Sequence, residues 1–166
     1  MTNETKEIAV VEYNVFRHSL LRYAGYANEI GESFRYQFPR LVAPSYIVAF
    51  GYCFADSFVT GWSTWTHPQQ GNKDQRSIWN DTVRATADTL LWQTLASVMI
   101  PGATINLIVK ASRLAVRKSP MALPLLVSKW SPTLVGISSI PVIVHPIDDA
   151  VDVLLDITTR QWWPKQ

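Results

Sequence analysis

The sequence is short of charged residues and contains few of the residues that usually build catalytic or metal sites. Only 17% of its 166 residues are Asp, Glu, Lys or Arg, below the roughly 25% of typical soluble chains. A single cysteine, Cys53, excludes an intrachain disulfide framework. The patterns GxxxxGK[ST], GxSxG, HExxH and CxxC are absent, and the first of these absences excludes a P-loop NTPase. We therefore expect no catalytic, cofactor-binding or metal-binding residues.

The charges are missing in three blocks. Residues 41–59 carry one charge, Asp56, residues 89–109 carry none, and residues 130–147 contain only a histidine. A helix needs roughly 20 mainly apolar residues to cross about 30 Å of hydrocarbon, so each block is long enough to span a membrane. Ser, Thr, Gln or Asn interrupts every block, but three such blocks in one short chain support one another. They predict an all-α, single-domain, integral membrane bundle of about three transmembrane helices with flanking amphipathic helices.

Tryptophans support the membrane interpretation because most of them stand at the edges of these blocks, as in the aromatic belts of membrane proteins. The residues concerned are Trp62, Trp65, Trp130, Trp162 and Trp163. Trp92 lies inside the second block and does not fit a belt. A soluble helical module stays open as an alternative, since buried core helices and weak membrane spans overlap in composition.

Prolines interrupt two of the predicted spans. Pro101 and Pro141 each remove a backbone hydrogen bond and kink the helix, and in lipid the freed carbonyl needs a partner. Small residues such as Gly102 allow that close helix packing. Asn106 and Gln93 could form interhelical hydrogen bonds or line a polar path in a small transporter or channel.

Basic residues concentrate on one side of the predicted bundle. Residues 110–129 hold five basic residues and no acidic one, and with three spans they share a side with the N-terminal segment. That side carries ten basic residues and the opposite side five, so the positive-inside rule places it on the cytoplasm-equivalent side. Asp88 and Asp152, in the similar runs TADTLL and AVDVLL, both fall on the opposite side. A net charge of +2 is not a nucleic-acid signature, and we expect the basic loop to face anionic lipids.

Residues 20–38 are predicted to form an amphipathic helix that leads to Pro39. Apolar residues recur with helical spacing at Tyr23, Tyr26, Ala27, Ile30 and Phe34, and charged residues occupy the rest of the surface. Glu29 and Glu32 could act as an acid-base pair, but Glu32 and Arg35 at i, i+3 favour a solvated ion pair. Gly25 and Gly31 indicate that another helix packs here. The candidate interaction residues are Arg22, Tyr23, Gly25, Asn28, Glu29, Gly31, Glu32 and Arg35.

The stretch IPVIVHPIDDAVDVLLD, residues 140–156, passes from apolar residues to a cluster of aspartates. Pro146 suits the first turn of a new helix at 148–160, and Asp148 suits its positive N-terminal end. The carboxylates then need no ligand. A metal site made of His145, Asp148 and Asp152 is the alternative interpretation.

Four runs of the sequence together resemble the mitochondrial fission process protein family, also called the mitochondrial 18 kDa protein family. They are RYAGYANEIGESFR (22–35), PSYIVAFGYCFADSF (44–58), DTLLWQTLASVMIPGATIN (88–106) and IPVIVHPIDDAVDVLLD (140–156). The resemblance covers most of residues 20–157, while residues 1–19 and 61–80 carry no family motif. It implies a multi-span protein of the mitochondrial inner membrane that promotes mitochondrial division and influences inner-membrane organisation, without family catalytic residues.

The residues and the resemblance together predict a non-enzymatic scaffold or adaptor embedded in the inner membrane. The N-terminus and residues 110–129 would then face the matrix. We expect anionic lipids and other inner-membrane proteins as partners and no nucleic acid, and nothing in the sequence specifies an oligomeric state. A small transporter or channel component is the alternative function.

Overall fold

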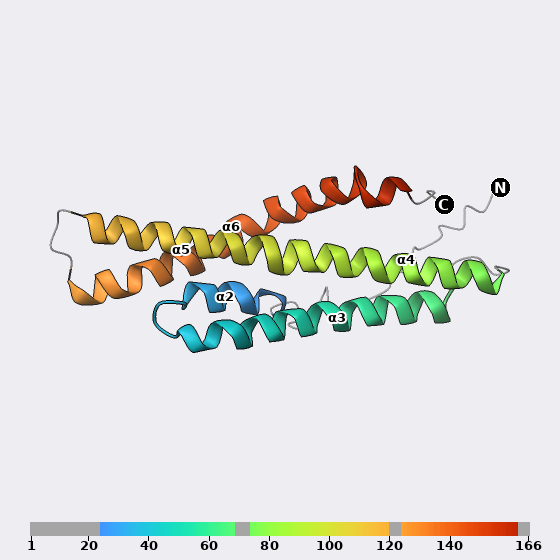
Figure 1. The fold of residues 1–166 in the computed structure, drawn as a ribbon, viewed down its shortest axis with the longest axis horizontal. Helices are drawn as coiled ribbons and strands as arrows, with labels where there is room; N and C mark the ends of the chain where they lie inside the picture. The colour runs from blue at the N-terminus through green and yellow to red at the C-terminus, as the bar shows by residue number, and fades with distance from the viewer. Residues whose placement is uncertain (1–23, 69–73, 120–123, 163–166) are drawn as a thin grey trace, which may run out of the picture.

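The computed structural model describes residues 24–68, 74–119 and 124–162, and within these ranges it contains helices and no strands (Figure 1). The α-helices are α2 (Ala27–Ser33), α3 (Val42–Thr66), α4 (Gln75–Gln93), α5 (Ile100–Lys118) and α6 (Leu125–Asp156). A π-helical segment, Thr94–Met99, joins α4 to α5. Short 3-10 helices, Pro39–Leu41 and Thr159–Trp162, precede α3 and follow α6. The all-α prediction is confirmed.

Three helical rods are long and apolar enough to cross a membrane. They extend over Pro39–Thr66, Gln75–Lys118 and Leu125–Trp162, with 28, 44 and 38 residues. The blocks predicted at 41–59, 89–109 and 130–147 each fall within one rod, so the predicted number of spanning-length helices is confirmed. Consecutive rods run in opposite directions, and α4 and α5 form one nearly straight rod through the π-helical segment (Figure 1).

The prediction of a separate C-terminal helix at 148–160 is wrong. The helix α6 runs without a break from Leu125 to Asp156, and Pro146 lies inside it rather than in a first turn. A proline removes one hydrogen bond, but Ile147, Val151 and Leu155 continue the apolar face beyond it and pack around Ala96 of the π-helical segment. This tertiary packing maintains the helix through the proline.

The predicted amphipathic helix at 20–38 is much shorter in the structure. Its α-helical part is α2, seven residues preceded by a 3-10 turn at 24–26 and followed by a turn, while residues 20–23 lie outside the described residues. The chain must reverse before α3, and Phe38 adopts a non-helical conformation because it precedes Pro39. The short helix lies along one half of α3 and packs against α3, α5 and α6 (Figure 1).

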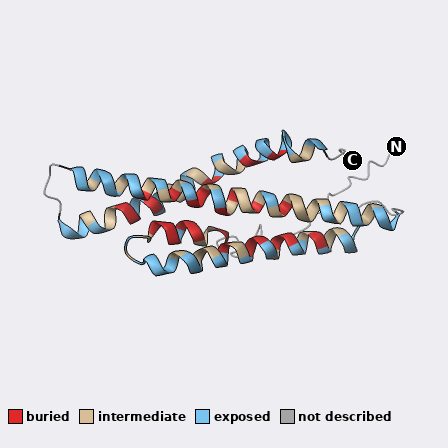
Figure 2. Cartoon of the chain, in the orientation of Figure 1, coloured by how far each residue is buried: buried red, intermediate tan, exposed pale blue. Residues whose placement is uncertain are grey.

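The interior of the bundle combines an apolar core with buried polar side chains, and its outer surface is rich in apolar side chains. Around α2 the interior holds fully buried polar side chains, including Asn28, Glu29 and Asp56 (Figure 2). Large apolar side chains instead cover the outside, with Ile47 72% and Val142 71% exposed. Buried polar groups beneath an apolar surface are typical of helices that pack in lipid, where polar groups must find partners within the protein.

The two ends of the bundle differ in charge. One end, called the basic end here, holds the turn between α2 and α3, the end of α5 and the start of α6, and the other, called the acidic end, holds the end of α3, the start of α4 and the end of α6 (Figure 1). The basic end holds Arg35, Arg40, Lys110, Arg113, Arg117, Lys118 and Lys129. Asp74, Asp81, Asp88, Asp152 and Asp156 lie toward the acidic end, together with Arg76, Arg84 and Arg160.

Candidate functional site

Glu32 lies at the centre of a hydrogen-bond network that joins α2, α3 and α5. Arg35 donates from Nε and Nη2 to its two carboxylate oxygens at 2.6 Å each, Asn106 Nδ2 donates at 2.7 Å, and the Tyr46 hydroxyl donates at 3.0 Å. Burial alone would raise the pKa of Glu32, but these donors together lower it below its usual 4.5. The ion pair with Arg35 is present as predicted, although its carboxylate is buried and not solvated.

Glu29, one turn earlier on α2, has the opposite environment. Its side chain is fully buried, and neither carboxylate oxygen has a hydrogen-bond partner within the described part of the chain. Burial, with a smaller contribution from the charge of Asp148 on α6, raises the pKa of Glu29 to about 8. Glu29 is therefore neutral under conditions in which Glu32 is ionised. Neither residue lines the cavity between α2 and α6, so the acid-base pair considered as an alternative to the ion pair has no substrate space there.

The predicted amphipathic helix buries the face that was expected to be solvated. Asn28, Glu29, Glu32 and Ser33 are all buried, whereas the apolar Ile30 is 46% exposed. The burial of this face differs from the expectation because the amphipathic pattern identifies two faces of the helix but does not say which face meets the surrounding medium. In lipid the apolar face is the outer one.

Asn28 connects α2 to the irregular backbone before Pro101. Its Nδ2 donates to the carbonyl oxygen of Val98, within the π-helical segment, at 3.0 Å. Gly102 permits this approach, since a Cβ there would lie 2.6 Å from the Tyr46 hydroxyl and 2.8 Å from Asn28 Nδ2. A side-chain donor thus supplies a partner to backbone that departs from the regular α-helical pattern beside a proline.

Other glycines also bring α2 close to its neighbours. A Cβ at Gly25 would lie 3.1 Å from the ring of Tyr52, and one at Gly31 would collide with Ser45, so both predicted glycines pack against α3. On α6, a Cβ at Gly136 would lie 2.7 Å from Ser33 Oγ. These close approaches place the polar face of α2 between the long helices.

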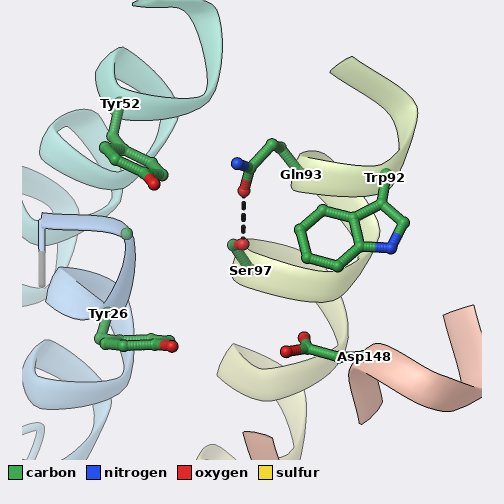
Figure 3. Close-up of a pocket in the computed structure, with 7 residues that line it drawn as sticks. Tyr26, Tyr52, Trp92, Gln93, Ser97 and Asp148 are labelled. Atoms are coloured by element: carbon green, nitrogen blue, oxygen red, sulfur yellow. Dashed lines mark hydrogen bonds between the residues drawn. The ribbon is translucent and has the colours of Figure 1, made fainter. Parts of the chain in front are cut away.

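A cavity of about 100 Å³ lies between the start of α2, α3, the π-helical region and α6 (Figure 3). Gln93 and Asp148 line it, and the aromatic rings of Tyr26 and Tyr52 face Trp92 across it (Figure 3). Its other polar lining residue is Ser97, which donates to Gln93 Oε1 at 2.6 Å.

The two polar residues that the sequence could not assign make interhelical hydrogen bonds. Gln93 Nε2 donates to Asp56 Oδ2 of α3 at 2.6 Å, and Asp56 is fully buried. Asn106 donates to Glu32. Both amides therefore connect helices, and Gln93 also faces the cavity.

A second polar cluster, centred on Arg160, lies at the acidic end. Arg160 donates from Nε and Nη2 to the Asp88 carboxylate at 2.8 Å each, and from Nη1 to Asp152 and Asp156 at 3.0 Å each. It thereby joins α4 to α6. The sequence analysis missed Arg160, although its i, i+4 spacing from Asp156 was a usable signal.

The remaining candidate residues take no part in the hydrogen bonds of α2 or lie outside the described residues. Pro141, His145 and Pro146 are exposed on α6, and Arg22 and Tyr23 lie outside the described residues. Across the described ranges, no three His, Cys, Asp or Glu side chains are placed to hold a metal ion. Asp152, a member of the alternative metal site, pairs with Arg160 instead.

These features define the class of the protein: over the described residues it is a helical bundle with buried polar groups beside an apolar core, many exposed apolar side chains and three helices long and apolar enough to span a membrane. The family described as Mitochondrial 18 KDa protein (MTP18) matches residues 14–155, and the chain belongs to this family. The resemblance drawn from the four sequence runs is confirmed.

Relatives cover nearly the whole chain. It is 44% identical over 155 residues to "Mitochondrial fission process protein 1" of Caenorhabditis elegans, with 92% of this chain and 90% of the relative covered. It is 42% identical over 156 residues to the protein of that name in Homo sapiens, with the same coverage. The Caenorhabditis briggsae relative is 41% identical over 164 residues and covers 93% of this chain and 95% of its own length. No solved structure matches the chain.

Proposed function

We propose that this chain is a multi-span protein of the mitochondrial inner membrane that promotes mitochondrial fission as a non-enzymatic scaffold or adaptor. Relatives similar over about nine-tenths of the chain carry the name mitochondrial fission process protein 1. The observation that carries membrane insertion is the orientation of α2, whose polar face is buried between spanning-length helices while Ile30 points outward. Water does not favour that orientation, whereas a hydrocarbon medium does.

The scaffold role rests on what the interior polar groups do. Glu32 has four hydrogen bonds from three side chains, and Gln93 bonds Asp56 between helices. Groups engaged in this way set the geometry of the bundle rather than bind a substrate. The surfaces at the two ends then remain to contact lipids and other inner-membrane proteins.

The proposed orientation places the basic end in the matrix, because short loops with excess Lys and Arg stay on the cytoplasm-equivalent side. Cysteines introduced at Ala115 and Gln75, both exposed and at opposite ends, test it in a Cys53→Ala background. We expect an impermeant thiol reagent to label position 75 in intact mitoplasts and position 115 only after the inner membrane is opened. Labelling of both positions from the same side would contradict the three-span arrangement.

Complementation tests the function itself. In cells that lack the native protein, Glu32→Gln should insert into the membrane but restore fission poorly, because it removes the charge at the centre of the network. Asp149→Asn is the matched control, since it neutralises an exposed carboxylate on α6. Alkaline carbonate extraction should retain both variants. Release of the wild-type protein by carbonate would favour a soluble helical module. Equal restoration of fission by Glu32→Gln and Asp149→Asn would show that the hydrogen-bond network around Glu32 is not needed for fission.

The cavity beside Asp148 favours a second candidate function, a small transporter or channel component. Polar groups at Gln93, Ser97 and Asp148 surround about 100 Å³ of space inside the bundle. Reconstituted vesicles distinguish the candidates, because a scaffold predicts no ion or solute flux above protein-free vesicles. Flux that disappears in Asp148→Asn would establish transport instead.

A further inference from the structure

The basic end contains a cleft of about 350 Å³ between the turn after α2, the last turns of α5 and the first turns of α6. Arg113 and Arg117, one turn apart on α5, line it together with Lys129 of α6. None of its described lining residues is acidic. Within the described part of the chain, these three cations form no ion pair, whereas Arg35 nearby is already bound to Glu32.

The walls of this cleft hold its cationic groups in place. The Arg113 guanidinium stacks over the ring of Tyr36, with its central carbon 3.9 Å from the ring centroid. Gln37 Nε2 donates to the backbone carbonyl of Lys129 at 2.5 Å and so fastens the turn after α2 to α6. Stacking leaves the edge of a guanidinium free to donate, which is the geometry that binds phosphate oxygens with two hydrogen bonds.

The start of α6 adds positive potential at the same place. Its N-cap residue, Pro124, makes no side-chain capping hydrogen bond, and no acidic residue lies in the first turn. The first N–H groups of a helix have no partner within the helix and favour an anion. The Ser128 N–H already donates to the Pro124 carbonyl at 3.0 Å, so the helix start contributes the positive end of its dipole near the cleft and no hydrogen-bond donor in it.

We infer that this cleft binds the phosphate headgroup of an anionic phospholipid. The inference rests on the proposed insertion in the inner membrane. A lipid is favoured over a soluble anion because α6 continues from Lys129 toward the bilayer with exposed apolar side chains, among them Leu134 at 61% exposure, which would contact acyl chains. Three cations match a lipid with two phosphates, such as cardiolipin, better than a headgroup with one negative charge.

Native mass spectrometry of the full chain in detergent tests the inference with three probes: cardiolipin, phosphatidylcholine and inorganic phosphate. We expect the wild type to retain cardiolipin, to retain phosphatidylcholine far less, and to keep its cardiolipin when phosphate is added in excess. The double variant Arg113→Gln/Arg117→Gln should weaken cardiolipin binding by about tenfold or more, since it removes two charge-assisted phosphate contacts. Displacement of the lipid by inorganic phosphate would overturn the assignment to a lipid.

The matched control is Lys110→Gln/Lys118→Gln, which removes the same charge from exposed positions on the same helix that do not line the cleft. It should keep cardiolipin affinity within about twofold of the wild type. Equal weakening by both double variants would mean diffuse attraction and no site. Unfolding midpoints in lipid-free detergent check folding, and Lys129→Gln probes the same cleft if the arginine variant is unstable. Carbonate extraction separates the two proposals, because an inserted protein without cardiolipin affinity contradicts only the cleft.

Discussion

Glu29→Gln tests the most unusual feature of the interior, a carboxyl group kept neutral by burial beside an ionised one. Glu29 binds its proton more tightly in the folded protein than in the unfolded chain, because its pKa rises from 4.5 to about 8. Below pH 4.5 both states are protonated, and above pH 8 both are ionised. Between these values only the folded state keeps the proton, so the free energy of unfolding falls as the pH rises.

The size of the effect follows from the shift. Each pKa unit corresponds to about 1.4 kcal/mol, so ionising Glu29 in the folded state costs on the order of 5 kcal/mol across this window. The groups within electrostatic range are Asp148 on α6 and Tyr46 and Cys53 on α3, and among these Asp148 opposes ionisation of Glu29. Glutamine matches the neutral acid in shape. Glu29→Gln should therefore leave stability nearly unchanged at pH 5 and raise it at pH 8.

The assay is unfolding of the purified chain in detergent, followed by tryptophan fluorescence at pH values from 5 to 8.5. The wild-type midpoint should fall over this range, and the midpoint of Glu29→Gln should stay nearly level. Glu32→Gln is the control, because the lowered pKa of Glu32 keeps it ionised throughout. That variant should lose roughly 3 kcal/mol at every pH with an unchanged slope. If the unfolding midpoint of Glu29→Gln fell with pH as steeply as that of the wild type, the assignment of a neutral, buried carboxyl group to Glu29 would be refuted.

Three further changes probe the packing and the acidic end. Gly102→Ala should destabilise the bundle by about 1 to 3 kcal/mol, because its Cβ would meet the Tyr46 hydroxyl, whereas Gly51→Ala, with nothing within 4 Å, should be neutral or slightly stabilising in the same unfolding assay. Arg160→Gln should lower stability by about 1 kcal/mol, and added salt should weaken the wild-type protein toward the variant. Pro141→Ala should insert normally but straighten α6, so restored fission with unaltered assembly in complemented cells would show that this kink is incidental.

The sequence alone determined the class of fold and the polarity of the bundle. Whether a segment can cross a membrane depends on the summed hydropathy of about 20 neighbouring residues, so the three blocks fell within the three long helices. The concentration of basic residues in 110–129 is likewise a local property, and this segment lies at one end of the structure. The family could be identified from the order of four sequence runs, because this order does not depend on how the helices pack.

Only the tertiary structure decided which face of α2 is buried and which polar groups meet. Helical spacing shows that residues 27–33 have two faces, but the direction of burial depends on whether water or lipid surrounds the bundle. The contact between Asn106 and Glu32 joins residues 74 positions apart, and that between Arg160 and Asp88 joins residues 72 apart. Similarly, the local pattern assigned Pro146 to the first turn of a new helix, but α6 continues through it in the structure, since packing of Val151 and Leu155 offsets the missing hydrogen bond.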